Sequence, residues 1–171
     1  RKQGLEILID TARSLIDTPE ILFLLCGDGA VRAELQESAR DLSNIHFYPL
    51  QSLERLNDLL NLADIHVLPQ RADAADLVMP SKLSGMLASG KAVVATAAPE
   101  SELGAVIRET GVLTSPGNVE ELSAAFLALA KDPVQRAALG KKGRTWVLSH
   151  WAEERVLDAF EKHLENVLKS R

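Results

Sequence analysis

The sequence predicts an α/β fold in which a mainly parallel sheet is flanked by helices and followed by a helical tail. Strand-like apolar runs alternate with segments of helical periodicity along the chain, as in folds built from parallel strands. Hydrophobic types make up 46% of the chain and charged types 25%, the proportions of an ordinary globular domain. With 171 residues, the chain is expected to form a single domain spanning 1–171.

Charge and cysteine content exclude several classes of function. The net charge of −5 argues against nonspecific nucleic-acid binding, although it permits a local basic pocket for an anion. The single cysteine, Cys26, excludes an internal disulfide and is typical of a reducing compartment. One cysteine and four scattered histidines argue against a structural zinc site.

The first half of the chain predicts an opening helix followed by strand–helix units. Apolar residues recur at helical spacing from Leu5 to Ile16, and Pro19 ends that helix. The apolar run Ile21–Cys26 predicts a strand buried on both faces. The remaining elements are expected as a turn at 27–29, a helix at 31–42, a strand at 45–50, a helix at 53–63 and a strand at 65–68.

The second half continues the alternation and ends in helices. Residues 71–79 are expected to form a loop, and Pro80 suits the first turn of a helix that stops at Gly90. Asn118 and Glu121 fit a capping box at the start of a later helix. The other elements are expected as a strand at 92–97, a helix from 99 to 111, a strand at 112–114 and a helical tail from 133.

The order of elements predicts that the chain is part of a longer protein. A parallel sheet that begins with a helix lacks its first strand, which we expect upstream of Arg1. The chain also starts without a methionine.

Ligands of open α/β sheets bind beyond the carboxyl ends of the strands. The turn Gly27–Gly29 has this position and exposes backbone N–H groups that suit a phosphate, although tight packing also explains such a turn. The segment Met79–Lys82 combines a helix start, a hydroxyl and a lysine, which suits a diphosphate; a capped helix with a solvated lysine is the alternative. Lys2 could reach the same crevice or fray at the terminus.

Other polar residues point less clearly to a binding or catalytic role. Asp73 and Asp76 could bind a metal or sugar hydroxyls, but their spacing is too loose for a metal motif and they also fit solvated loop charges. His46 and His66 lie in apolar strands and are expected at the core or its rim, and His150 is expected to pack. Motifs of serine hydrolases, P-loops and dinucleotide-binding folds are absent from the sequence.

Four segments, in this order, resemble a known family. They are 21–29 (ILFLLCGDG), 63–69 (ADIHVLP), 80–96 (PSKLSGMLASGKAVVAT) and 111–144 (GVLTSPGNVEELSAAFLALAKDPVQRAALGKKGR). Together they resemble the C-terminal, nucleotide-sugar-binding half of retaining GT-B glycosyltransferases of group 1, a Rossmann-like lobe of a two-lobed enzyme. The opening RKQGLE and the stretch from Pro80 are most similar to the bacterial exopolysaccharide branch, of the colanic acid fucosyltransferase type.

The resemblance implies an enzyme whose donor, a GDP- or UDP-linked sugar, binds mostly to this lobe. The saccharide or lipid-linked acceptor would bind mostly to the other lobe, so this chain alone is expected to be inactive. Neither a metal nor a cofactor is implied, because a helix start and lysines can stabilise the leaving diphosphate electrostatically. The implied location is the cytoplasm, at most peripheral to the inner face of the membrane, in the synthesis of exopolysaccharide or lipopolysaccharide.

The resemblance also implies a donor site and leaves the catalytic residues unassigned, with Asp76 and Lys82 as candidates. The turn after residue 26 would approach the donor, the segment 48–51 would border the base, and the loop ending at 79 would face the sugar and phosphates. The implied donor-binding residues are Lys2, Gly27, Asp28, Gly29, Pro49, Leu50, Asp76, Met79, Pro80, Ser81 and Lys82.

Two departures from the family pattern leave the donor's identity open. The family often carries two glutamates separated by seven residues, and Leu77 and Gly85 occupy those positions here, with Asp76 as a neighbouring substitute. The usual Lys-Gly before the first helix is Gln3-Gly4. A sugar-nucleotide epimerase of the same architecture and a non-catalytic nucleotide-binding or scaffold domain therefore remain as alternatives; reaction products separate the first, and nucleotide binding the second.

Overall fold

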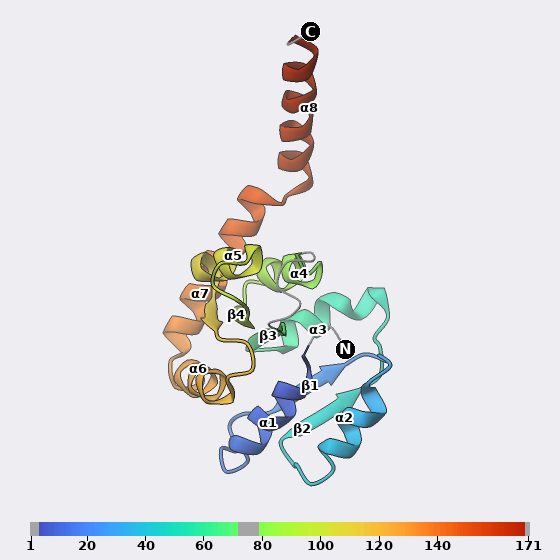
Figure 1. The fold of residues 1–171 in the computed structure, drawn as a ribbon, viewed down its shortest axis with the longest axis vertical. Coiled ribbons are helices and arrows are strands. Elements are labelled where there is room, and N and C mark those ends of the chain that lie inside the picture. Colours follow the sequence, from blue (N-terminus) through green and yellow to red (C-terminus); the bar gives the residue numbers. More distant parts are fainter. Residues whose placement is uncertain (1–3, 72–78, 170–171) are drawn as a thin grey trace.

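The computed structural model describes residues 4–71 and 79–169 and confirms an α/β fold with parallel strands (Figure 1). In the described residues, β1 (Phe23–Cys26) pairs with β2 (Ile45–Tyr48) in one parallel sheet. The second parallel sheet has the order β3 (Ile65–Pro69), β4 (Ala92–Thr96) and β5 (Val112–Thr114).

Helices separate the strands and form the C-terminal tail, in the order that the sequence predicts. They are α1 (Glu6–Ser14), α2 (Arg32–Ser38), the 3-10 helix η1 (Leu53–Arg55), α3 (Leu56–Leu62), α4 (Lys82–Ala88), α5 (Glu102–Thr110), α6 (Val119–Lys131), α7 (Pro133–His150) and α8 (Glu153–Lys169).

The strand β4 is central, because its side chains alternate between two hydrophobic clusters. Val94 joins the cluster formed mainly by α1, β1 and α6, in which the rings of Phe23 and Phe126 meet edge to face with centroids 5.5 Å apart. Val93 joins the cluster beneath α4, α5 and α7, where Leu87 is fully buried. All five residues of β4 are buried as a result.

The prediction that the first strand is buried on both faces is wrong. Phe23 is buried, whereas Leu24 is 42% exposed and Cys26 is also exposed. The face that carries Phe23 packs in the cluster with α1 and α6, while the opposite face stays open among the described residues. The strand also begins later than expected, since the Ile21 amide donates to the Thr18 carbonyl in a turn.

Several boundaries differ from the sequence prediction by a few residues. The expected helix at 31–42 ends at Ser38, and a turn follows in which the Leu42 amide donates to the Ala39 carbonyl. The expected helix at 53–63 is split into η1 and α3. The Asn118 half of the predicted capping box is confirmed at α6, where the Glu121 amide donates to Asn118 Oδ1 at 3.0 Å. The reciprocal half is not formed, because the Glu121 carboxylate accepts from the Ser115 amide and the Asn118 backbone amide donates to the Ser115 carbonyl.

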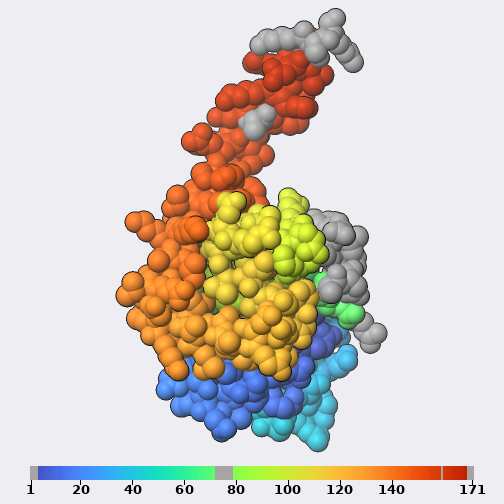
Figure 2. All heavy atoms as spheres, turned by 60° about the vertical axis from the view of Figure 1, so that its left-hand side comes forward, coloured from blue at the N-terminus to red at the C-terminus, as the bar shows by residue number. Residues whose placement is uncertain are grey.

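The last helix, α8, projects away from the rest of the molecule (Figures 1 and 2). It has a strongly apolar side that the body does not cover, so six of its large apolar side chains are 45–71% exposed. These are Val156, Leu157, Phe160, Leu164, Val167 and Leu168. Among the described residues, no helix combines the length and apolarity needed to cross a bilayer.

Candidate functional site

The carboxyl ends of β1 and β2 lie next to each other. The two strands are parallel and in register, with Cys26 opposite Tyr48. The turn that follows β1 and the segment that follows β2 therefore emerge side by side, and the Gly27 amide donates to the Tyr48 carbonyl at 3.1 Å. This arrangement brings together two of the predicted groups of donor-binding residues.

One side chain bridges these two segments. Arg32, the first residue of α2, donates from Nη1 to the carbonyl oxygen of Gly27 at 2.5 Å and to that of Tyr48 at 2.6 Å. The sequence analysis did not single out this arginine. The available signal was the oppositely charged Asp28 four residues earlier in the chain.

Asp28 makes the second connection between the segments. One carboxylate oxygen, Oδ2, accepts from the Leu50 amide at 3.0 Å, and the other, Oδ1, lies 3.3 Å from Arg32 Nη1. The predicted residues Asp28 and Leu50 are thus in direct contact, and the exposed Pro49 lies between the two bridged positions.

The turn after β1 borders open space. Gly27 has a φ of 140°, a conformation that favours glycine, and a Cβ added there would meet nothing within 4 Å. A Cβ at Gly29 would also meet nothing within 4 Å. A ligand can therefore approach this backbone closely.

The carboxyl ends of β3 and β4 are joined by a buried hydroxyl. Thr96 Oγ1 accepts from the Gln70 amide and donates to the Gln70 carbonyl, both at 2.9 Å. Gly4, just before α1, adopts a φ of +60°, and a Cβ there would lie 2.9 Å from Arg71 Cγ. Arg71 is therefore a cation at this end of β3 that the sequence analysis did not single out.

The segment before α4 confirms a helix start but not a Ser81 cap. The Leu83 amide donates to the Pro80 carbonyl at 3.0 Å, so the first turn forms around Pro80, while the Ser81 side chain caps no backbone amide. Met79 and Pro80 are half-buried, and Ser81 and Lys82 are exposed. Three other predicted residues, Lys2, Asp73 and Asp76, lie outside the described residues.

Three titratable residues of the strands are Cys26 in β1, His46 in β2 and His66 in β3. Burial raises the pKa of the Cys26 thiol, and the smaller effect of Arg32 opposes it. His66 is buried, with Nε2 3.1 Å from Ser89 Oγ, and burial lowers its pKa. His46 is exposed at the rim. Within 4–71 and 79–169, no three histidine, cysteine or acidic residues gather as a metal site.

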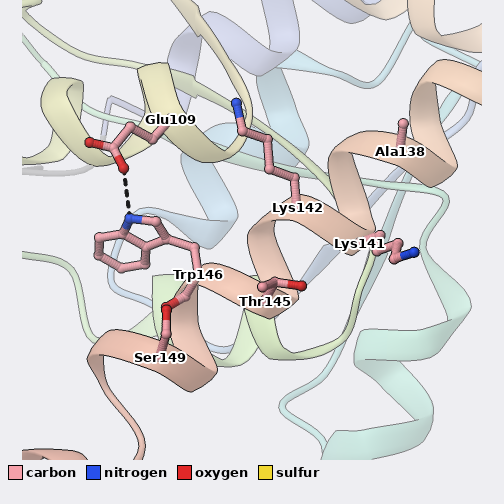
Figure 3. Close-up of a pocket in the computed structure, with 7 residues that line it drawn as sticks. All are labelled: Glu109, Ala138, Lys141, Lys142, Thr145, Trp146 and Ser149. Carbon is pink, nitrogen blue, oxygen red and sulfur yellow. Dashed lines mark hydrogen bonds between the residues drawn. The ribbon is translucent and has the colours of Figure 1, made fainter.

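A separate hollow of about 700 Å³ lies between α5 and α7 (Figure 3). Trp146 Nε1 donates to Glu109 Oε2 at 2.9 Å along its wall, and the His150 ring stacks on Trp146 at a centroid distance of 4.3 Å, which confirms that His150 packs. Glu109 is in the last turn of α5, the end remote from the carboxyl end of β4. The hollow is therefore distinct from the edge described above.

The fold is an α/β domain in which the parallel strands β1 and β2 end side by side at the edge described above. Residues 1–132 match the family described as "Glycosyl transferases group 1", and the chain belongs to this family. The predicted family and fold class are thereby confirmed.

Two relatives illustrate the similarity in sequence. The chain is 39% identical, over 98% of its length, to the putative colanic acid biosynthesis glycosyl transferase WcaI of Escherichia coli (strain K12). It is 29% identical, over 99% of its length, to a GDP-mannose-dependent monoacylated alpha-(1-6)-phosphatidylinositol monomannoside mannosyltransferase of Corynebacterium glutamicum. The chain spans only 39% and 44% of these proteins.

Solved structures show the same fold. Sucrose-phosphate synthase from Thermosynechococcus elongatus matches 100% of this chain with 44% of its own, at a TM-score of 0.79 and 21% identity. Anabaena HepE, solved in complex with UDP-glucose, matches 99% of this chain with 46% of its own, at a TM-score of 0.75 and 18% identity.

Proposed function

We propose that this chain is the donor-binding domain of a retaining glycosyltransferase. The whole protein would transfer a sugar from a nucleoside diphosphate to a saccharide or lipid-linked acceptor in cell-surface polysaccharide synthesis. The observation that carries the proposal is the bridged edge at the carboxyl ends of β1 and β2, in a chain of the group 1 glycosyltransferase family.

The proposed chemistry relies on electrostatics. Negative charge develops on the leaving diphosphate as the glycosidic bond breaks, and prearranged N–H groups and cations stabilise it. The turn at Gly29, which borders open space, and the exposed Lys82 are suited to this task, whereas the Gly27 amide is already bonded to the Tyr48 carbonyl. The proposal includes neither a metal nor a cofactor, and Asp76 remains a candidate for contacts to the sugar.

The names of similar proteins support a nucleotide sugar but differ in the base. The C. glutamicum relative is called GDP-mannose-dependent, whereas HepE was solved with UDP-glucose. The WcaI relative is named for colanic acid biosynthesis, which supports a role in exopolysaccharide synthesis. We propose that the acceptor is presented at the inner face of the cytoplasmic membrane.

Thermal unfolding against GDP, UDP, ADP and their sugar conjugates tests the proposal. A ligand at 100 times its dissociation constant adds about 2.7 kcal/mol of stability and raises the Tm by a few degrees. We expect a shift with one base, and Lys82→Ala should reduce it. Lys141→Ala, which changes an exposed lysine beside the remote hollow, is the matched control and should leave the shift unchanged.

One observation favours the scaffold alternative. Position 85 of α4, where the family often has a glutamate, is a glycine without a side chain. The absence of any nucleotide-dependent shift, in this chain and in the whole protein, would favour the scaffold. Binding without transfer to a saccharide acceptor, accompanied by conversion of the sugar nucleotide, would instead favour the epimerase.

A further inference from the structure

Arg32 connects three groups that belong to two different loops. Its Nη1 donates to the carbonyl oxygens of Gly27 and Tyr48 and lies 3.3 Å from the Asp28 carboxylate. Asp28 in turn accepts from the Leu50 amide. The guanidinium and the carboxylate therefore form one continuous bridge between the turn after β1 and the segment after β2.

The position of Arg32 on its helix indicates that the bridge, and not helix stability, explains its presence. It is the first residue of α2, where the helix dipole disfavours a positive charge. Hydrogen bonds from a charged guanidinium to two carbonyl oxygens are stronger than neutral ones and offset that disadvantage. Its side chain is only 23% exposed, so water weakens these contacts less than at a fully exposed site.

The bridged edge also occupies two backbone amides that would otherwise be open to a ligand. The Gly27 amide is bonded to the Tyr48 carbonyl, and the Leu50 amide is bonded to Asp28. What remains at this edge is a fixed shape: the open backbone of the glycine turn on one side and the exposed side chains of Tyr48 and Leu50 on the other.

We propose that Arg32 is a positioning residue for the nucleoside part of the donor. It holds the glycine turn and the Tyr48–Leu50 segment at the separation that a nucleoside requires, and it acts through these segments. The inference rests on the proposed function, which places the donor at this edge. Loss of Arg32 lets the two loops separate, so an ordering cost is added to nucleotide binding.

Isothermal titration of this chain with the nucleoside diphosphate that raises the Tm most tests the inference. We expect Arg32→Ala to raise the dissociation constant at least about ten-fold. Arg32→Lys, which keeps the charge but replaces the planar fork, should give an intermediate value. Asp28→Asn should also weaken binding, because it removes the charge at the centre of the bridge.

Leu35→Ala is the matched control for a purely structural effect. Leu35 is buried on the same helix, α2, but belongs to the hydrophobic cluster and makes no part of the bridge. We expect this variant to lose stability in urea while its nucleotide affinity stays within about two-fold of the parent.

Three results would overturn the inference, and only the third also overturns the proposed function. If the parent chain binds a nucleotide and both Arg32→Ala and Asp28→Asn bind it equally well, the bridge does not position the nucleoside, and the proposed function stands. If Leu35→Ala loses as much affinity as Arg32→Ala, the effect is general destabilisation. If the parent binds no nucleotide, the proposed function fails and the inference fails with it.

Discussion

Gly140 of α7 lies directly against the carbonyl oxygen of Gly90, at the point where α7 crosses the end of α4. A Cβ built on Gly140 would come within 1.9 Å of that oxygen, closer than any side chain permits. Gly143, one turn later, faces the side chain of Leu87, with 2.8 Å between an added Cβ and Leu87 Cδ2, an atom that can shift more easily than backbone. The close approach of α7 to the end of α4 therefore depends mainly on Gly140.

The first prediction concerns this crossing. Alanine normally stabilises a helix interior relative to glycine by about 1 kcal/mol. At position 140 we expect the opposite sign, because the methyl group must push α7 away from a backbone atom; the free energy of unfolding should fall by about 1–3 kcal/mol. Urea unfolding of Gly140→Ala measures the change.

The control for this prediction is Ala137→Ser on the exposed side of the same helix, which should change stability by no more than about 0.5 kcal/mol. An unchanged or increased stability in Gly140→Ala would show that α7 does not approach Gly90 as closely as described.

The second prediction concerns acid sensitivity. Burial lowers the pKa of His66 below its usual 6.5, and the charge of Lys91 acts in the same direction. The unfolded chain therefore binds more protons than the folded chain in mildly acidic solution, so this histidine destabilises the fold as the pH falls through 6.5. Above that pH the imidazole is neutral in both states and has no such effect.

Urea unfolding at a series of pH values from 8 to 5, chosen at about one-unit steps around the histidine pKa, measures this dependence. His66→Gln should make the free energy of unfolding depend less on pH across this range, because the glutamine amide does not titrate. Ala137→Ser, which changes an exposed residue that does not titrate, should keep the parent slope. Equal slopes for parent and His66→Gln would contradict the prediction.

The third prediction concerns the start of α5. Ser101 is buried at the N-cap, where its Oγ accepts from the Gly104 amide at 3.0 Å and donates to the Ala98 carbonyl at 2.6 Å. Ser101→Ala removes both bonds and should cost about 1 kcal/mol. Thermal unfolding measures the loss, with Ser84→Ala on an exposed side of α4 as the control. A Tm equal to that of the parent would contradict the role of the cap.

The fourth prediction concerns α8. A single helix of this length is only marginally stable in water without packing, and the apolar side of α8 is uncovered by the body. We expect its amides to exchange hydrogen much faster than those of α7. Deletion of residues 153–171 should leave the urea midpoint unchanged and reduce binding of a hydrophobic dye. Slow exchange in α8 of the monomeric chain would refute this description.

The sequence predicted most elements because their signals are local. The strand at 112–114 and the Asn118 cap were found from short-range patterns, in which the residues that decide the structure lie within a few positions of one another. The exposed face of β1 was mispredicted for the opposite reason. Its run of apolar residues reads as a buried strand, but whether a helix covers each face depends on distant segments.

The features of the candidate site were likewise predicted only in part. Glycines after a predicted strand and a lysine at a predicted helix start led to a candidate ligand edge from sequence alone, because ligands of parallel sheets bind at the carboxyl ends of strands. Arg32 and Arg71 were not singled out, since an arginine in a helical or loop segment looks like a solvated charge until its neighbours in space are known.

The fold class, the order of the elements and the family could be predicted from the amino-acid sequence. The arrangement of the elements in space was needed to show that Arg32 and Asp28 bridge the segments after β1 and β2, that Gly140 lets α7 approach the end of α4, and that the apolar side of α8 is uncovered by the body. Periodicity and turn residues act over a few positions and can be read along the chain. Hydrogen bonds and close approaches between elements depend on how distant segments meet, which no local pattern records.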